Sequence, residues 1–196
     1  MPRAVTHPTV TVTETERMWA EERMAALGVG EGAPVIGIHP GASSDDKRYP
    51  EDRFARAAEE VADAMGHGAR IAILEGPGDA ARADAVVAAS PSTVARPGPA
   101  TLRQTMALMA RADVMLVNDS GPMHLAAALG TPLAAVFGPT DDRRWMPRQP
   151  RATLVKPDAT RPGALAPESG ASNVREIPTE WVVEAAMDAL AEGRRP

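Results

Sequence analysis

The stretch that decides the fold is "VNDSGPMHLAAALGTP", residues 117–132. It continues an apolar run, and its polar residues 118–120 stand in front of an alanine-rich segment that begins with Gly121 and Pro122. Proline in the first turn and glycine just past the end are typical of a helix, which here ends at Gly130. The stretch therefore predicts a buried strand that passes into a helix through a short polar loop.

Apolar runs of the same kind recur along the chain. They do not alternate between apolar and polar residues, which favours strands covered on both faces, as in a parallel sheet. The expected strands are 34–39, 70–75, 113–118 and 132–138. The expected helices are 14–27, 50–65, 78–89, 101–112, 121–129 and 179–193. Alternating strands and helices predict an α/β fold, a Rossmann-like open parallel sheet with helices on both faces.

The chain divides into four segments. The first carries an amphipathic helix in which Thr13 and Glu16 have the spacing of a capping box. The third is rich in Pro, Gly, Ala and Ser and is interpreted as a mobile excursion. The expected divisions are a linker-like segment (1–33), a Rossmann-like domain (34–156), the excursion (157–178), and a C-terminal helix and tail (179–196).

The composition argues against several classes of protein. The 196 residues carry a formal net charge of -5 and include 3% aromatic residues, whereas nucleic-acid binders show a basic stripe and aromatic stacking platforms. Without cysteine, neither a disulfide framework nor a thiolate metal site is expected. No stretch approaches the roughly 20 apolar residues of a membrane span, and the first residues lack the apolar core of a secretory signal. We expect a cytoplasmic protein with no nucleic-acid partner and no transmembrane segment.

Ligands of open parallel sheets bind beyond the carboxyl ends of the strands. The expected site therefore consists of the loops after residues 39, 75, 117 and 137. At the start of the 121–129 helix, free N–H groups and the helix dipole attract an anion such as a phosphate. Gly121 would let a bulky ligand approach the backbone. The alternative is structural: Asp119 or Ser120 caps the helix, and His124 forms a local hydrogen bond.

The loop "HPGASSDDKRYP", residues 39–50, combines small residues with a cation. This combination suits a polyphosphate, because the backbone of the small residues comes close while Lys47 adds a point charge. The loop is not a P-loop, since the G-x-x-x-x-G-K-[ST] spacing is absent. The alternative is a solvated turn in which Lys47 and Arg48 pair with Asp45 and Asp46.

Two further loops carry candidate residues. Asp79 follows a Gly-Pro-Gly turn, where its carboxylate is placed to accept hydrogen bonds from ribose hydroxyls, although an Asp before a helix is also a common cap. Trp145 is either an exposed contact surface or a side chain that folds back onto the core. Asp141 and Asp142 would point apart on an extended segment, so they do not predict a metal site.

Four motifs occur in one order: "HPGAS", "KRYP", "NDSGPMHLAAALGTP" and "VFGPTD". With these spacings the chain resembles glycosyltransferase family nine, the ADP-heptose lipopolysaccharide heptosyltransferases, most clearly over residues 34–150. That family has the GT-B architecture, in which two Rossmann-like domains face each other across a cleft. Its C-terminal domain holds most of the nucleotide-sugar donor, and the resemblance implies that this chain is that half.

The resemblance also implies roles for single residues. Lys47 would contact the donor phosphate and stabilise the leaving group, Asp119 would bind sugar hydroxyls, and Asp79 would bind the ribose. The base would lie near the 99–102 loop. The implied donor-binding residues are Gly41, Ala42, Ser43, Lys47, Asp79, Asp119, Ser120, Gly121, Pro122 and His124. The chain departs from the family at Tyr49, where a tryptophan is usual.

The reaction of the family is an inverting glycosyl transfer, in which the nucleoside diphosphate gains negative charge as it leaves. Lys47 and the N–H groups of the 121–129 helix would stabilise that charge in preference to a metal, so no metal or other cofactor is expected. The carboxylate that deprotonates the acceptor belongs to the family's N-terminal domain, for which this chain has no counterpart.

The implied partners follow from that reaction. They are a nucleotide-sugar donor, a lipopolysaccharide-core or other saccharide acceptor, and either an N-terminal GT-B half or a second copy of the chain. A lipopolysaccharide acceptor would place the protein peripherally at the inner membrane. Trp19 and Trp181 either contribute to an apolar docking face or are ordinary core residues.

Two other interpretations of the chain stay open. One is a non-catalytic nucleotide-sugar-binding module, and the other is a GT-B relative, such as an epimerase, that acts on another sugar nucleotide.

Overall fold

The fold is an open α/β sheet in which all six strands are parallel. The computed structural model describes residues 7–66, 68–92, 94–157 and 173–192. Its strands are β1 (Val35–His39), β2 (Arg70–Ile73), β3 (Val94–Ala95), β4 (Val114–Asn118), β5 (Leu133–Val136) and β6 (Ala152–Val155). They lie in the order β3-β2-β1-β4-β5-β6, which is that of a Rossmann fold, so the predicted class is confirmed.

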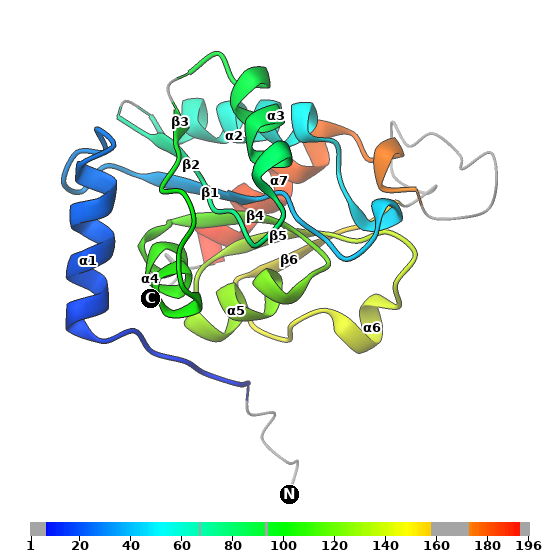
Figure 1. Ribbon diagram of the computed structural model, residues 1–196. Helices are drawn as coiled ribbons and strands as arrows, with labels where there is room; N and C mark the ends of the chain where they lie inside the picture. Colours follow the sequence, from blue (N-terminus) through cyan, green and yellow to red (C-terminus); the bar gives the residue numbers. More distant parts are fainter. Residues whose placement is uncertain (1–6, 67, 93, 158–172, 193–196) are drawn as a thin grey trace, which may run out of the picture.

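Helices cover both faces of the sheet (Figure 1). They are α1 (Glu14–Ala25), α2 (Glu51–Met65), α3 (Ala80–Ala89), α4 (Leu102–Arg111), α5 (Gly121–Leu129), α6 (Asp142–Trp145) and α7 (Thr179–Glu192), with single 3-10 turns η1 (Asp45–Lys47) and η2 (Val174–Glu176). None of the helices in the described ranges has the length and apolar character needed to cross a membrane.

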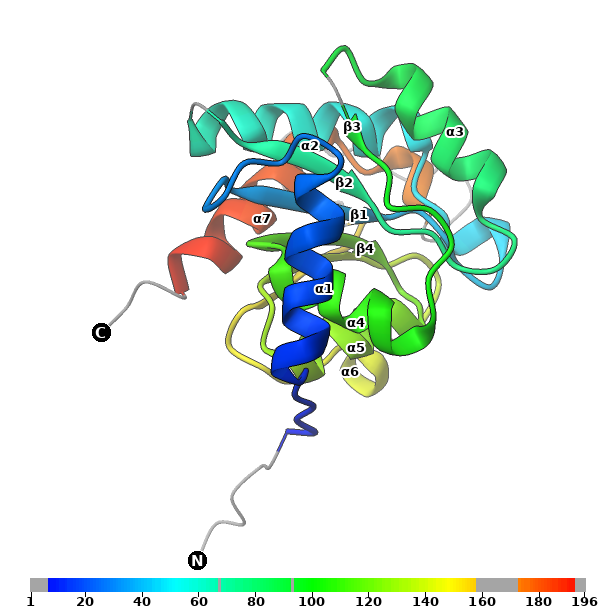
Figure 2. The same cartoon turned by 60° about the vertical axis from the view of Figure 1, so that its left-hand side comes forward.

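The core has two halves, because successive side chains of a strand point to opposite faces. Ile36 and Ile38 of β1 pack in the half that α2, α3 and α7 cover. Met115 and Val117 of β4 pack in the half that α1, α4 and α5 cover. In Figure 2, α1 runs across the front of the sheet beside α4, whereas α2 and α7 lie behind the sheet. Both faces of the sheet are covered by helices, which explains the continuous apolar runs of the inner strands.

The strand order reverses between β1 and β4. These two strands are neighbours in the sheet although they are far apart in the chain: Ile36 pairs with Val114, and His39 pairs with Val117. From β1 the sheet grows outward through β2 and β3, and from β4 it grows in the other direction through β5 and β6. Such a reversal is the place where open α/β sheets bind ligands.

The four predicted strands and six predicted helices are present, with ends that differ by a few residues. The two edge strands, β3 and β6, and the one-turn helix α6 were not expected from the sequence. β3 has two residues, and most of β6 is only half-buried, so neither gives a long apolar run.

The N-terminal segment packs onto the sheet domain. The capping box of Thr13 and Glu16 is present, as predicted, and Ala20 of α1 is buried in the core half shared with α4. Trp19 is half-buried against the same half, and Trp181 is 7% exposed in the other. The structure therefore favours the core interpretation of both tryptophans over a docking face.

Most of the predicted excursion, residues 158–172, lies outside the described residues. Its end is part of the packed domain, because Val174 and Ile177 are fully buried beside α2 and α7. The Tyr49 hydroxyl also donates a hydrogen bond to the Ile177 carbonyl over 3.1 Å. The prediction of an excursion as far as residue 178 is therefore wrong for this end, where two apolar side chains join the core.

Candidate active site

A cavity of about 560 Å³ opens at the carboxyl edge of the sheet. The loops after β1, β2, β4 and β5 line it, and these are the four loops that the sequence predicts. All ten residues expected to bind a donor line this cavity: Gly41, Ala42, Ser43, Lys47, Asp79, Asp119, Ser120, Gly121, Pro122 and His124. Five residues that were not predicted to bind the donor also line it: His39, Gly76, Pro77, Thr140 and Trp145. The fold thus gathers the predicted residues in one place.

Lys47 and Asp119 form an ion pair inside this cavity. Lys47 ends η1, and its Nζ lies 2.8 Å from Oδ2 of Asp119, which follows β4. The Asp119 side chain is 7% exposed and that of Lys47 is 24% exposed. The alternative in which Lys47 pairs with Asp45 or Asp46 is therefore wrong, because its ammonium points across the strand reversal instead of back along its own loop.

Arg48, the other cation of the loop, stabilises the conformation of the loop itself. It pairs with Asp45, as the alternative proposed, and its Nη2 and Nε donate hydrogen bonds to the Ala42 carbonyl over 2.9 and 3.1 Å. These bonds close the loop on itself. They leave Lys47 as the cation of this loop that lines the cavity.

The start of α5 is not capped by a side chain. Ser120 is the N-cap residue, but its hydroxyl donates to the Asn118 carbonyl over 3.2 Å and does not accept from the first turn. Pro122 has no N–H, and the Met123 N–H donates to the Ser120 carbonyl over 3.1 Å. The capping alternative is therefore wrong, and no side chain of the described residues occupies the N–H groups at the start of α5, among them that of Gly121, where an anion can bind.

Asp79 stands at the end of the cavity formed by the loop after β2. It precedes α3 but does not cap it; its Oδ2 instead accepts a hydrogen bond from the Gly76 N–H over 3.2 Å. Gly41 approaches it so closely that a Cβ on Gly41 would lie 2.3 Å from Oδ2. The loops after β1 and β2 therefore both pack closely against the Asp79 carboxylate, whose side chain is 18% exposed.

His39, which sequence reasoning missed, lies beneath Asp79. The last residue of β1, it is buried, and its Nε2 is 4.0 Å from Oδ2 of Asp79. Burial lowers the pKa of His39, and the negative charge of Asp79 opposes that shift only in part. A histidine at the end of an otherwise apolar strand was the available signal, since a buried polar residue at a strand's carboxyl end points to a site.

The loop after β5 closes the other end of the cavity. Asp141 caps α6 by accepting from the Arg143 N–H over 3.1 Å, whereas Asp142 accepts from Nζ of Lys156 over 2.6 Å. The Lys156 ammonium holds the pKa of Asp142 below its usual range. The two carboxylates therefore act separately, as expected.

Trp145 ends α6 and is 47% exposed. It lines the cavity, so the alternative in which it folds back onto the core is wrong. Within the described ranges, no group of three or more His, Asp or Glu side chains is placed to hold a metal ion.

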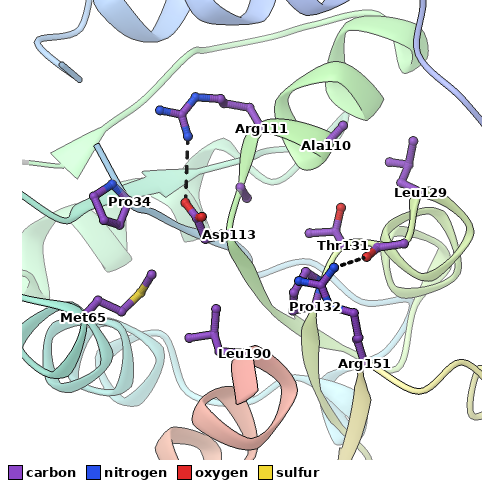
Figure 3. A pocket seen from close by; sticks show the side chains of 12 residues that line it. Pro34, Met65, Ala110, Arg111, Asp113, Leu129, Thr131, Pro132, Arg151 and Leu190 are labelled. Carbon is purple, nitrogen blue, oxygen red and sulfur yellow. Dashed lines mark hydrogen bonds and ion pairs between the residues drawn. The ribbon is translucent and has the colours of Figure 1, made fainter. Parts of the chain in front are cut away.

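A second cavity, of about 470 Å³, lies at the amino ends of the strands (Figure 3). Its charged side chains serve the fold: Arg111 donates to the Ala33 carbonyl over 2.9 Å and pairs with Glu21, and Asp113 accepts from the Val35 N–H over 2.8 Å. It contains none of the predicted residues. The first cavity is therefore the candidate active site.

A comparison with protein-family models now places the chain. Residues 1–164 match the model described as glycosyltransferase family 9 (heptosyltransferase). The chain belongs to glycosyltransferase family 9. The match extends over the N-terminal segment that the sequence analysis treats as a linker, which agrees with the packing of α1 on the sheet domain.

Similar proteins include bacterial heptosyltransferases and a further solved member of family 9. The lipooligosaccharide heptosyltransferase 2 of Haemophilus influenzae is 30% identical over 149 residues, which are 73% of this chain and 42% of that protein. Among solved structures, a family 9 protein of Veillonella parvula superposes with a TM-score of 0.80 at 26% identity, over 94% of this chain and 54% of that one. The E. coli ADP-heptose lipopolysaccharide heptosyltransferase II also gives a TM-score of 0.80, at 24% identity, over 100% of this chain and 57% of that one.

This family 9 chain therefore spans less than half the length of the curated relative and little more than half of each solved structure.

Proposed function

We propose that this chain binds the nucleotide-sugar donor of an inverting glycosyltransferase of the heptosyltransferase type. The observation that carries the proposal is the strand reversal between β1 and β4, where Lys47 and the uncapped Gly121 N–H line one cavity. A cation and a free helix-start N–H are the donors that a diphosphate needs. The diphosphate is thereby assigned to the middle of the cavity.

With the diphosphate assigned to the middle of the cavity, the positions of the ribose and of the transferred sugar on either side of it can be assigned as well. Asp79 offers a carboxylate on the β2 side, where it accepts hydrogen bonds from ribose hydroxyls. Asp119, on the β4 side, has the acceptor oxygens that suit hydroxyls of the transferred sugar. The 99–102 loop, which starts α4, is the proposed neighbour of the base.

The chemistry is a displacement at the anomeric carbon. The acceptor oxygen forms a bond to that carbon while the bond from the carbon to the diphosphate oxygen breaks, and the electron pair leaves with the nucleoside diphosphate. Lys47 and the Gly121 N–H stabilise the charge that builds up on the leaving oxygen, which lowers the barrier because the charge is larger in the transition state than in the donor. No metal ion is required by this proposal.

The acceptor side is assigned to residues outside this chain. In the resemblance to family nine, the carboxylate that removes the acceptor proton belongs to the N-terminal domain of the GT-B fold. We assign the acceptor to a lipopolysaccharide core or another saccharide, and the proposed place of action is the inner membrane surface, reached peripherally. The donor is assigned as ADP-heptose, because the E. coli structural relative is described as an ADP-heptose enzyme.

Calorimetric titration with ADP, UDP and GDP, each with and without Mg²⁺, tests the proposal. We expect ADP to bind selectively, with an affinity that Mg²⁺ leaves unchanged. Binding of none of the three by the folded chain would overturn donor binding, and a strict need for Mg²⁺ would overturn the role given to Lys47. Equal binding of all three nucleotides would overturn the assignment of the base.

A further inference from the structure

Trp145 is an exposed aromatic side chain on the wall of the candidate active site. In the described part of the chain, four large apolar side chains are strongly exposed: Met18, Val87, Leu102 and Trp145. Of these four, only Trp145 lines the candidate active site. An indole left in water forgoes the stabilisation that burial of its large apolar area would give. Because Trp145 lies on the cavity wall, a ligand bound in the cavity would bury its exposed indole.

The surrounding contacts hold this indole at the rim. The backbone N–H of Trp145 donates to the Asp141 carbonyl over 3.1 Å, and the Asp141 carboxylate caps the same turn, so the backbone that carries the indole is fixed. The ion pair of Asp142 with Lys156 ties α6 to the end of β6. The Arg144 guanidinium lies over the indole, 5.4 Å from the ring centroid. The ring is thus supported before any ligand arrives, which reduces the entropy lost on binding.

The strand order says which part of a donor reaches Trp145. Asp79 follows β2, Lys47 and Asp119 follow β1 and β4, and Trp145 follows β5, so these groups lie in that sequence along the edge of the sheet. Figure 1 shows α3, which Asp79 precedes, above the central strands, and α6 below them. Three strand spacings of about 4.8 Å each separate β2 from β5. With the ribose at Asp79 and the diphosphate at Lys47, the sugar extends toward Trp145.

We propose that Trp145 is the platform on which the pyranose ring of the bound nucleotide sugar stacks. One face of a pyranose carries a row of C–H groups and is apolar, so it packs against the negative face of an indole, while the hydroxyls of the ring edge remain for polar groups such as Asp119. This proposal rests on donor binding at the same cavity. It makes Trp145 a residue that selects a sugar-bearing nucleotide over the free nucleoside diphosphate.

Calorimetric titration with ADP and with ADP-heptose tests this role in wild-type protein, Trp145→Ala and Trp145→Phe. We expect Trp145→Ala to lose at least fivefold in affinity for ADP-heptose and less than twofold for ADP, and Trp145→Phe to keep most of the affinity for both. Met18→Ala, which removes another exposed apolar side chain that lies outside the cavity, should change neither. Thermal unfolding of each variant confirms that it is folded.

The outcomes separate this inference from the proposed function. Wild-type protein that binds ADP, with unchanged ADP-heptose affinity in Trp145→Ala, would overturn the platform and leave donor binding standing. An equal loss for both ligands in Trp145→Ala would also overturn it, since the contact would then be to the nucleotide. Wild-type protein that binds neither ligand would overturn both proposals.

Indole fluorescence gives a second readout. The chain has three tryptophans, of which Trp181 is buried and Trp19 half-buried outside the cavity. We expect ADP-heptose to change the emission of wild-type protein more than ADP does, and this difference to disappear in Trp145→Phe. A difference of the same size in that variant would count against stacking on Trp145.

Discussion

At the scale of single residues, the Lys47–Asp119 pair is the centre of the site. The two charges satisfy each other, because Nζ and Oδ2 are 2.8 Å apart. In the proposed complex, the diphosphate competes with Asp119 for the ammonium. The sequence identified both residues, but their contact was not predictable, since it depends on β1 and β4 being neighbours.

Replacing Lys47 by alanine should weaken ADP binding by about 1–3 kcal/mol, the range for a charged hydrogen bond. It should also lower the free energy of unfolding, because the nearly buried carboxylate of Asp119 loses its partner. Calorimetry and urea unfolding measure the two effects. Arg56→Ala, which removes a cation that pairs with Glu60 outside the cavity, is the control and should leave ADP affinity unchanged. Equal affinities of Lys47→Ala and wild-type protein would remove Lys47 from the site.

Gly121 offers a test of where the ligand lies. A Cβ at this position meets no atom within 4 Å, so Gly121→Ala should change stability by no more than about 0.5 kcal/mol. We expect ADP affinity nevertheless to fall about tenfold, or roughly 1.4 kcal/mol, because the added methyl occupies space assigned to the phosphates. Gly41→Ala is the contrast, since its Cβ collides with Asp79 and should lower the melting temperature as well. Unchanged ADP affinity in Gly121→Ala would move the phosphates elsewhere.

His39 makes stability depend on pH near neutrality. Its pKa is below 6.5 in the folded protein, so the unfolded chain binds the proton more readily. The stabilisation is complete above pH 6.5 and is lost as the pH falls below that value. Urea unfolding between pH 7.5 and pH 5 should therefore show a smaller loss of stability in His39→Gln than in wild-type protein. Parallel pH profiles for the two proteins would contradict this.

At the scale of elements, the strands and helices whose sequence pattern reflects burial were predictable. The inner strands appear as continuous apolar runs because both of their faces are covered, and the capping box before α1 is visible as Thr13 with Glu16. The edge strands β3 and β6 are too short for such a signal. α6 was missed because one turn shows no helical period, although its capping residue, Asp141, was present in the sequence.

The contact between α1 and α4 adds a second pH dependence. Arg103 of α4 donates to Glu16 over 2.6 Å, and this bond is the main cause that lowers the pKa of Glu16 to about 2. The stabilisation is therefore present above pH 4.5 and is lost as the pH falls through about 2. Glu16→Gln keeps the capping box and should unfold at a lower temperature than wild-type protein at pH 7, and this difference should shrink as the pH falls toward 2.

The control for the second pH dependence is Glu14→Gln on the same helix. Glu14 pairs with Arg17 one turn away, and both side chains are well exposed, so this pair contributes little. Thermal unfolding of the variants by circular dichroism measures the difference. A larger effect at pH 7 for Glu14→Gln than for Glu16→Gln would be inconsistent with the assignment.

At the scale of the whole molecule, parallel strands explain why loop prediction succeeded. All carboxyl ends meet at one edge, so residues from four loops converge without any knowledge of the strand order. The order itself was not predictable, because pairing of β1 with β4 leaves no local trace in the sequence. That His39 and Trp145 line the same cavity likewise became visible only in three dimensions.

We propose that this chain binds the donor and that a separate N-terminal half supplies the base and the acceptor site. This arrangement predicts how transfer is restored. The chain alone, with ADP-heptose and a lipopolysaccharide-core acceptor, should release ADP no faster than a protein-free control. Adding the separately produced N-terminal half of a family 9 heptosyltransferase should raise ADP release, because it supplies the base and the acceptor site. Lys47→Ala should abolish that gain. Failure of every such pairing, with ADP binding intact, would favour the non-catalytic module.

The pairing of β1 with β4 also governs how the chain reaches its native state. Ile36 meets Val114, 78 positions later, so the central contact of the sheet closes a long loop. Contacts of such sequence separation form late and slowly, because the entropy of loop closure is lost before the contact stabilises anything. The proposed phosphate position between Lys47 and Gly121 forms only once these strands have met. Nucleotide binding during refolding should consequently appear with the slowest phase, after helical circular dichroism has largely recovered.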